Sequence, residues 1–288
     1  MEETARQASY QAAVQLIEWN RYKEALSEAQ RLLGQDPEDP DTMALIGKIY
    51  LHLNRYDDAL RWAGESLRRE PEHPLAWFVR VGVYYENGQS KACEEALVEA
   101  QRIDPYESFY YYMKANLLNK KGKFREAKEE LLQALELNPE RPLYLATLSY
   151  VEALLGDDAA SARLDRQALR QDAEDPYVLL HLAWAARSRG DDELDETYMK
   201  SAVRLQPDDK QFQDEYLIAL QRANPMFRFF SAPGRLLRRL KPWQIFLSWF
   251  VAWVVFKPLV VAFIVLYVLA NWGTKAFVHV KVFGWRRR

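Results

Sequence analysis

The sequence repeats itself every 34 residues, and this period constrains the fold more than any other feature. Two short stretches with helical periodicity, separated by a turn, recur from residue 6 to residue 209. The turn position carries residue types that tolerate a left-handed backbone: Asn20, Asn54, Gly88, Gly122, Gly156 and Gly190. One copy cannot bury its apolar face alone, so six copies in register predict a stack of helix pairs.

Further positions keep the same register. The position that closes each copy reads Pro37, Pro71, Pro105, Pro139, Ala173 and Pro207. Small side chains dominate two positions of the second helix, which allows close approach of a neighbouring backbone. They read Ala25, Ala59, Cys93, Ala127, Ser161 and Asp195 at the first position, and Leu32, Ser66, Ala100, Ala134, Ala168 and Ala202 at the second. The sixth copy departs twice, with Asp195 in place of a small residue and Asp192 where Tyr22, Tyr56 or Phe124 stands elsewhere. We therefore expect a looser sixth repeat with a more exposed second helix.

The period and these positions resemble the tetratricopeptide repeat (TPR), a helix–turn–helix unit of this length. The best individual matches are Gly47, Tyr50, Tyr56, Ala59 and Pro71 in the second copy, and Trp77, Tyr84, Gly88, Ala100 and Pro105 in the third. The resemblance implies an all-α solenoid of six repeats, closed by a capping helix at 210–224. The predicted order is a polar lead at 1–5, repeats at 6–39, 40–73, 74–107, 108–141, 142–175 and 176–209, the cap, a linker with a basic amphipathic segment at 225–242, a membrane segment at 243–272 and a basic tail at 273–288.

The resemblance also indicates where a partner would bind. TPR partners usually lie along the concave surface formed by the first helices of the repeats. Candidate residues on that surface are Phe78, Tyr85, Phe109, Tyr112, Asn116, Asn119, Tyr150 and Trp184. Aromatic side chains with scattered asparagines suit an extended or helical peptide with apolar anchors. The alternative is that many of these aromatics pack between repeats. The family's clamp for acidic chaperone peptides is not found, because Lys48, Asn116 and Asn119 do not have its spacing.

Charge is divided unevenly along the chain. Residues 226–288 hold eleven basic and no acidic side chains, and residues 1–225 have a formal net charge of -13. The acidic repeats argue against nucleic acid as a partner, because phosphate contacts need Lys and Arg. The one cysteine, Cys93, excludes an intramolecular disulfide and is expected to be packed and inert. The N-terminus carries no apolar run of a secretory signal, so the repeats are expected in the cytoplasm.

The basic C-terminal part contains an apolar segment. Two apolar runs, 245–256 and 259–270, flank Lys257 and Pro258. Each of the 17 Leu, Ile, Val and Phe residues between 245 and 270 contributes roughly -0.3 to -0.6 kcal/mol to the free energy of membrane insertion. Together they outweigh the one lysine, which costs about +2.5 to +3.5 kcal/mol. The segment therefore predicts membrane insertion through 235–288. The flanking residues suited to headgroups and the interface include Arg238, Arg239, Lys241, Trp243 and Trp272.

The mode of insertion stays open. A single helix, kinked at Pro258, fits the length. A re-entrant hairpin keeps the basic residues on both sides of the segment on the cytoplasmic face. After the segment, Val278, Val280 and Val282 alternate with polar residues, which fits an interfacial helix or a short strand equally well.

The sequence contains no recognisable set of catalytic residues. The sequence has no phosphate loop, no dinucleotide fingerprint and no paired-histidine zinc motif, so we expect no enzyme, cofactor, metal or small-molecule substrate. The favoured function is a membrane-anchored scaffold that recruits a protein or peptide at the cytosolic face. The first alternative is a subunit of a membrane complex assembled through the apolar segment. A second is a regulator or enzyme accessory whose groove is closed by its own tail.

Overall fold

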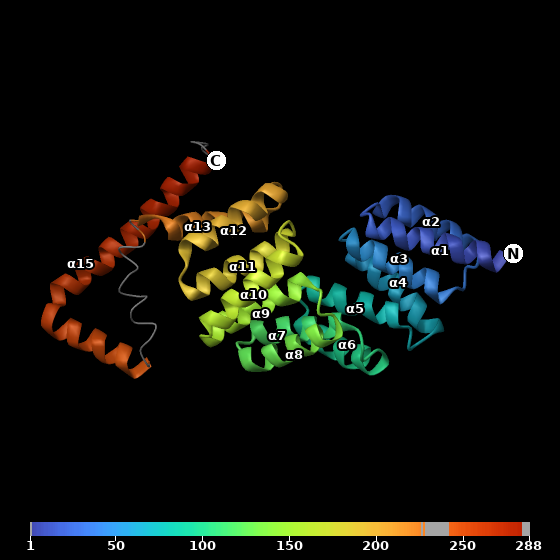
Figure 1. The fold of residues 1–288 in the computed structure, drawn as a ribbon, viewed down its shortest axis with the longest axis horizontal. Helices are drawn as coiled ribbons and strands as arrows, with labels where there is room; N and C mark the ends of the chain where they lie inside the picture. The colour runs from blue at the N-terminus through green and yellow to red at the C-terminus, as the bar shows by residue number, and fades with distance from the viewer. Residues whose placement is uncertain (1, 226, 228–241, 284–288) are drawn as a thin grey trace. The chain divides into compact units, whose positions relative to one another are not determined.

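The computed structural model describes the backbone of residues 2–225, 227 and 242–283, and these residues form fourteen helices (Figure 1). They are α1 (Glu2–Glu18), α2 (Tyr22–Gln35), α3 (Pro40–His52), α4 (Tyr56–Arg69), α5 (Pro74–Glu86), α6 (Ser90–Ile103), α7 (Ser108–Lys120), α8 (Phe124–Leu137), α9 (Pro142–Leu155), α10 (Asp158–Gln171), α11 (Pro176–Arg189), α12 (Asp192–Leu205), α13 (Lys210–Ala223) and α15 (Pro242–Phe283). The chain divides into two compact units, unit 1 (Met1–Pro139) with α1–α8 and unit 2 (Glu140–Arg288) with the remainder. The predicted all-α architecture of helix–turn–helix repeats is confirmed.

Local sequence explains where the helices begin and turn. Four first helices, α3, α5, α9 and α11, have proline in the first turn, where its missing N–H costs no hydrogen bond. Asp39 caps α3 by accepting a hydrogen bond from the Thr42 N–H at 3.2 Å. The predicted turn residues all have positive φ, from 57° at Asn54 to 87° at Gly156. The turn chemistry was therefore predicted correctly.

Close packing within each helix pair depends on the small residues of the second helix. Ala25, Ala59, Ala127 and Ser161 are all fully buried. At Gly47 of α3, an added Cβ would lie 3.3 Å from the Ala59 carbonyl oxygen of α4, so the backbones of the two helices approach closely. The small residues thus set the spacing between the helices of a pair.

Cys93 occupies the same position in the third repeat. It is fully buried, and its Sγ lies 3.7 Å from the Val81 carbonyl oxygen. Burial raises the pKa of its thiol to about 11. The prediction of a packed cysteine is confirmed. Because the thiolate is the reactive form, the raised pKa favours an inert thiol, which stays a prediction.

The prediction of a looser sixth repeat is wrong. Its second helix, α12, is continuous, Asp195 is fully buried and Asp192 is 3% exposed. Each carboxylate pairs with an arginine on another helix of unit 2, Asp195 with Arg187 on α11 and Asp192 with Arg222 on α13. The error came from treating each acidic residue alone, since a buried charge is tolerated once it is paired.

The predicted capping helix is α13, which packs against α12 in unit 2. Its Phe212 and Ala219 are fully buried in a cluster that also contains Leu180 of α11 and Met199 of α12. The apolar face of α13 therefore completes the core of the sixth repeat. Because arginine on α13 also pairs with Asp192, both apolar and ionic contacts hold the helix in place.

The apolar segment lies in α15, a 42-residue helix that also includes residues 278–282, so helix is the observed form of that stretch. Figure 1 shows a change of direction within α15, whose interior contains Pro258. Large apolar side chains of α15 that are exposed to solvent include Trp243, Phe246, Phe250, Ile264, Leu269 and Trp272.

Three of the predicted headgroup residues, Arg238, Arg239 and Lys241, lie outside the described residues, and the side chains of Lys257 and Pro258 are not described either. Within the part of the chain that the structure describes, no helix combines the length and apolar character needed to cross a membrane. The membrane anchor thus stays a prediction.

The C-terminal half of α15 contacts α13 through polar and small residues. The Gln221 side chain donates to the Asn271 Oδ1 at 2.6 Å. Ala270 and Thr274, one turn apart, are 8% and 2% exposed, whereas Trp272 between them is 78% exposed. One side of this turn therefore packs against the cap and the other faces away from it.

Candidate functional site

Unit 1 carries an aromatic row, defined here as Lys48, Phe78 and Phe109, one residue from each of α3, α5 and α7. The two phenyl rings are tilted against each other with centroids 4.5 Å apart. The Lys48 ammonium lies 5.8 Å from the Phe78 ring centroid, within cation–π range. Both phenylalanines are half-buried, so the row offers two partly exposed phenyl rings on α5 and α7 beside the lysine on α3.

The other predicted residues of unit 1 are buried or half-buried. Tyr112 and Asn116 are 7% and 8% exposed. Asn119 is half-buried with a buried side-chain oxygen, and Tyr85 is half-buried under the Lys120 ammonium at 4.4 Å. Little of the Tyr112 and Asn116 side chains thus faces solvent, and a role for these residues in partner binding stays a prediction.

Unit 2 contains a pocket of about 290 Å³, lined by Tyr150 of α9, Trp184, Arg187 and Ser188 of α11, and Glu215 of α13. We call it the Trp184 pocket. It brings together the two predicted groove residues of this unit, with the Tyr150 and Trp184 ring centroids 5.7 Å apart at 51°. Burial raises the pKa of Tyr150, so its hydroxyl is protonated at neutral pH. The aromatic walls of the pocket are therefore uncharged.

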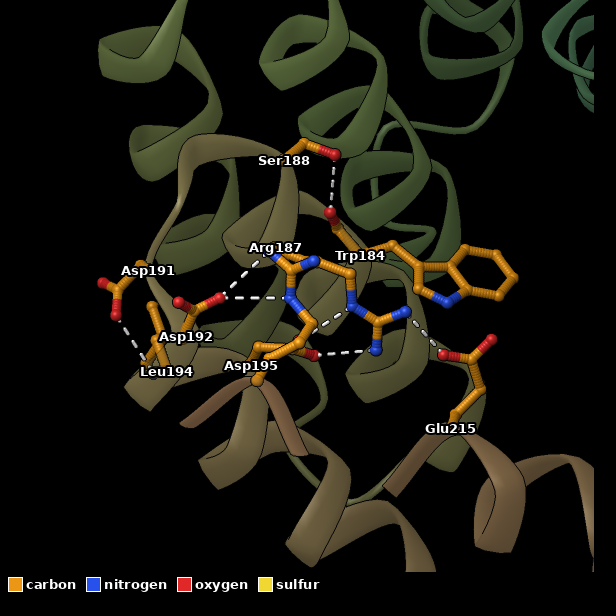
Figure 2. A network of polar contacts seen from close by, with 9 residues as sticks. Trp184, Arg187, Ser188, Asp191, Asp192, Leu194, Asp195 and Glu215 are labelled. Carbon is orange, nitrogen blue, oxygen red and sulfur yellow. Dashed lines mark hydrogen bonds and ion pairs between the residues drawn. The ribbon is translucent and has the colours of Figure 1, made fainter. Parts of the chain in front are cut away.

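Arg187 lines this pocket and is held by two carboxylates (Figure 2). Its Nε and Nη2 donate to the two oxygens of Asp195 at 2.8 and 3.1 Å, a bidentate geometry. Its Nη1 donates to Glu215 at 2.8 Å. Burial works against the charge, but hydrogen bonds and attraction from Asp195 and Glu215 outweigh it and raise the pKa of Arg187. The guanidinium thus links three helices, α11, α12 and α13.

A second buried ionic cluster stabilises the other side of α11. Arg189 Nη2 donates to Asp165 of α10 at 2.6 Å, and both side chains are less than 10% exposed. The Ser149 hydroxyl of α9 donates to the Ser161 carbonyl at 3.0 Å and also contacts Asp165. Hydrogen bonds therefore join the three helices of this cluster. At the positions of Ser149, Ser161 and Asp165 the fourth repeat has Ala115, Ala127 and Leu131.

Sequence reasoning missed Arg187 and Glu215. Arg187 stands on α11 three residues after Trp184, at one of the positions that face the groove in the family, so the rule that selected Trp184 would also have selected it. Glu215 comes from α13, beyond the last repeat, and the period therefore gave no signal for it. Among the described residues, no group of three or more His, Cys, Asp or Glu side chains has the geometry of a metal site.

Comparison with known proteins agrees with the helix–turn–helix repeats of both units. Models of the tetratricopeptide repeat match residues 16–65, 110–141 and 158–210. No curated protein sequence matches the chain. The predicted TPR repeats are therefore confirmed by models that match in both units.

Solved structures are similar in fold. One is a chain of the APC/C hetero-tetramer Cut9–Hcn1, with a TM-score of 0.64 and 15% identity over 75% of this chain and 43% of that one. A second is Pseudomonas aeruginosa PilF, with a TM-score of 0.57 and 17% identity over 74% of this chain and 96% of that one. A third is a TPR protein from Parabacteroides merdae, with a TM-score of 0.57 and 12% identity over 74% and 84%. This chain thus spans less than half of the Cut9–Hcn1 chain, and at these identities the likeness shows the fold alone.

Proposed function

We propose that this protein is a non-enzymatic scaffold that binds a protein or peptide partner along its first helices and holds it at a membrane. The TPR fold is one that serves protein interaction, and this part of the statement stands on the repeats themselves. The observation that carries the site is the Trp184 pocket, where Tyr150 and Trp184 meet beside Glu215 on a surface made by α9, α11 and α13. Half-buried aromatic residues of this kind are common anchors in protein interfaces.

The aromatic row of unit 1 offers a second contact of the same character. Phe78 and Phe109 lie in contact and partly exposed, so a partner's apolar side chain can cover both rings. An extended or helical peptide with apolar anchors matches such a row. Each unit therefore supplies its own contact surface, and two contacts on one chain raise the effective concentration of a partner at the second.

Binding is tested by purifying tagged full-length chains from their native membranes in detergent and measuring the proteins that accompany them. Trp184→Ala should reduce the main partner about tenfold or more, as expected for an aromatic anchor. Trp19→Ala is the matched control, because Trp19 is 58% exposed and lies in the turn of the first repeat. Equal recovery with both variants would contradict a binding role for the pocket.

The membrane part of the proposal is supported by the sequence of 245–270 and by the apolar side chains that α15 exposes. Large exposed apolar patches mark contact with a membrane or a protein. Basic residues on both sides of the apolar segment favour the cytoplasmic face of the bilayer, which would place the repeats in the cytoplasm.

Flotation with lipid vesicles tests this part. The full chain should float with the vesicles and resist alkaline extraction, and a chain lacking 235–288 should do neither. If the full chain stays in the aqueous fraction without detergent, the membrane proposal fails. Accessibility of the end after Arg288 to a membrane-impermeant label then separates the two modes of insertion, because only a hairpin keeps both ends of the segment on one side.

The alternative function is a subunit of a membrane complex assembled through the apolar segment. The same exposed side chains of α15 favour it, since another transmembrane protein can cover them as well as lipid can. The two functions differ in where the partner is held. Partners lost on deletion of 235–288 indicate a complex subunit, and partners retained by the truncated chain indicate the scaffold.

A further inference from the structure

We propose that the Trp184 pocket binds a cationic side chain, a lysine or an arginine presented by the partner. This inference names the chemistry of a site used in the proposed function and rests on it only for the existence of a natural partner. It follows from three features of the pocket, which are its aromatic walls, its balance of charge and its size.

The walls present aromatic surface at a distance suited to a cation. The Tyr150 and Trp184 rings, 5.7 Å apart and tilted, leave parts of both rings accessible in the pocket. A cation within about 6 Å of such a ring is attracted to its face. The His181 ring packs edge-on against Trp184 at 5.0 Å, and a hydrogen bond of 2.8 Å to the Tyr177 carbonyl orients it. Burial lowers the pKa of His181, so the ring behind Trp184 is neutral at neutral pH and does not repel a cation.

The charges around the pocket leave a surplus of one negative charge. Among the described residues that line the pocket, Arg187 is the one cation, and Asp195 and Glu215 both pair with it. The neighbouring Arg222 also acts on Asp195, but it is paired with Asp192, so this second pair adds no net charge. Asp195 accepts from two guanidinium nitrogens of Arg187, and Glu215, whose side chain is 20% exposed, accepts from the third. A single guanidinium cannot neutralise two carboxylates. The field in the pocket therefore favours an incoming positive group.

The hydrogen-bonding groups that line the pocket also favour a cationic ligand. The Ser188 hydroxyl donates its proton to the Trp184 carbonyl at 2.9 Å, so its oxygen remains available as an acceptor. Glu215 adds carboxylate acceptors. Lysine and arginine offer only donors, whereas a carboxylate ligand would have to displace Glu215 from Arg187 and approach Asp195.

The size of the pocket limits what can enter. Its volume of about 290 Å³ lies just below the range of roughly 300–1,000 Å³ typical of small-molecule sites. One long side chain fits such a space, whereas most cofactors do not. The pocket is thus suited to a single anchoring residue of a peptide.

Fluorescence anisotropy with two labelled octapeptides tests the proposal, one alternating glycine with lysine and the other alternating glycine with glutamate. The full chain is used in detergent micelles at about 0.15 M salt, which screens general attraction to the acidic surface. We expect the lysine peptide to bind more tightly than the glutamate peptide. Glu215→Gln should weaken lysine-peptide binding about tenfold, because a charged hydrogen-bond partner is lost.

Asp214→Asn is the matched control. Asp214 is exposed, neighbours Glu215 on α13 and carries the same charge, so its removal should change affinity less than about twofold. Trp184→Leu should weaken the lysine peptide several-fold by removing the aromatic face. The amide oxygen of Gln at position 215 can still accept from Arg187, so Glu215→Gln keeps the fold, and far-UV circular dichroism checks each variant.

Three results would overturn the proposal: no measurable binding of the lysine peptide, tighter binding of the glutamate peptide, or equal weakening by Glu215→Gln and Asp214→Asn. None of these depends on a natural partner, because both probes are synthetic. If the lysine peptide binds as expected but Trp184→Ala leaves native partners unchanged, the proposed function fails and the cation site stands.

Discussion

The two units share one repeat and fill its equivalent interior positions in opposite ways. Ala127 in the fourth repeat and Asp195 in the sixth stand two periods apart, and both are fully buried. Near the end of the first helix, the equivalent residues are Asn119 in unit 1 and Arg187 in unit 2. At the position of Ala127 the fourth repeat thus packs a methyl group, whereas the sixth repeat packs the Asp195 carboxylate in a bidentate ion pair with Arg187.

The difference shows that the repeat fixes the backbone but leaves two ways to fill its interior. Apolar contacts are non-directional and tolerate exchange for residues of similar volume. A buried ion pair roughly offsets its own desolvation, yet loss of either partner leaves an uncompensated charge. The ion pairs should therefore not make unit 2 more stable than unit 1. They should make unit 2 more sensitive to the removal of a single charged residue.

The largest effect is expected from moving the acid into unit 1. Ala127→Asp buries a carboxylate where Asn119 stands in place of the arginine, at an expected cost of about 3–5 kcal/mol. Urea unfolding followed by hydrogen exchange of α7 and α8 measures this loss. The double variant Asn119→Arg, Ala127→Asp should recover part of it, because it recreates the pair. A fully stable Ala127→Asp chain would show that unit 1 does not require an apolar residue there.

The converse change in unit 2 should also be costly. Asp195→Ala removes the bidentate partner of Arg187 and leaves only Glu215, with an expected loss of about 3 kcal/mol. Hydrogen exchange of α12 amides reports it within unit 2. The control is Ala127→Gly at the equivalent position of unit 1, where we expect about 1 kcal/mol from helix propensity. A smaller loss for Asp195→Ala than for the control would contradict the role of the pair.

The turns should not distinguish the units. Gly122 and Gly190 have φ of 73° and 84°, and an added Cβ at either would meet no atom within 4 Å. Substitution by alanine therefore costs only the backbone strain, about 1 kcal/mol at each site. Thermal unfolding of the two single variants measures the effect. A difference of more than about 1 kcal/mol between them would mean that the turns, too, differ between units.

The smallest effect concerns Cys93 in unit 1. Its thiol pKa of about 11 lies above that of a free thiol, so the native thiol is protonated at pH 8. A maleimide should therefore label the native chain far more slowly than the urea-unfolded chain, and mass spectrometry follows the reaction. Rapid labelling of the native chain at pH 7 would show that the interior of the third repeat opens readily.

Sequence alone predicted the parts of the molecule that repeat. The turn at Gly156 and the buried small residue Ala59 follow directly from the 34-residue period, because each position answers one local steric requirement. The meeting of Tyr150 with Trp184 was also within reach, since equivalent positions on successive first helices lie side by side.

The ionic contacts could not be read in the same way. Asp195 stands out as an exception, but its partner Arg187 is eight residues away on another helix, and Arg222 is 30 residues from Asp192. A single sequence shows each charge separately, whereas pairing depends on the packing of α11, α12 and α13. The useful signal would have been that one copy gains an acid and a base together at positions that are uncharged in earlier copies.

The most direct test is a double-mutant cycle on Arg187 and Asp195 in the full chain. The variants are Arg187→Met, Asp195→Ala and both together, with the free energy of opening measured by hydrogen exchange of α12 amides. If the pair holds the sixth repeat, the double variant should be less destabilised than the sum of the single variants by about 1.5 kcal/mol or more. Additivity within about 0.5 kcal/mol would contradict the pairing and restore the interpretation of Asp195 as an isolated defect.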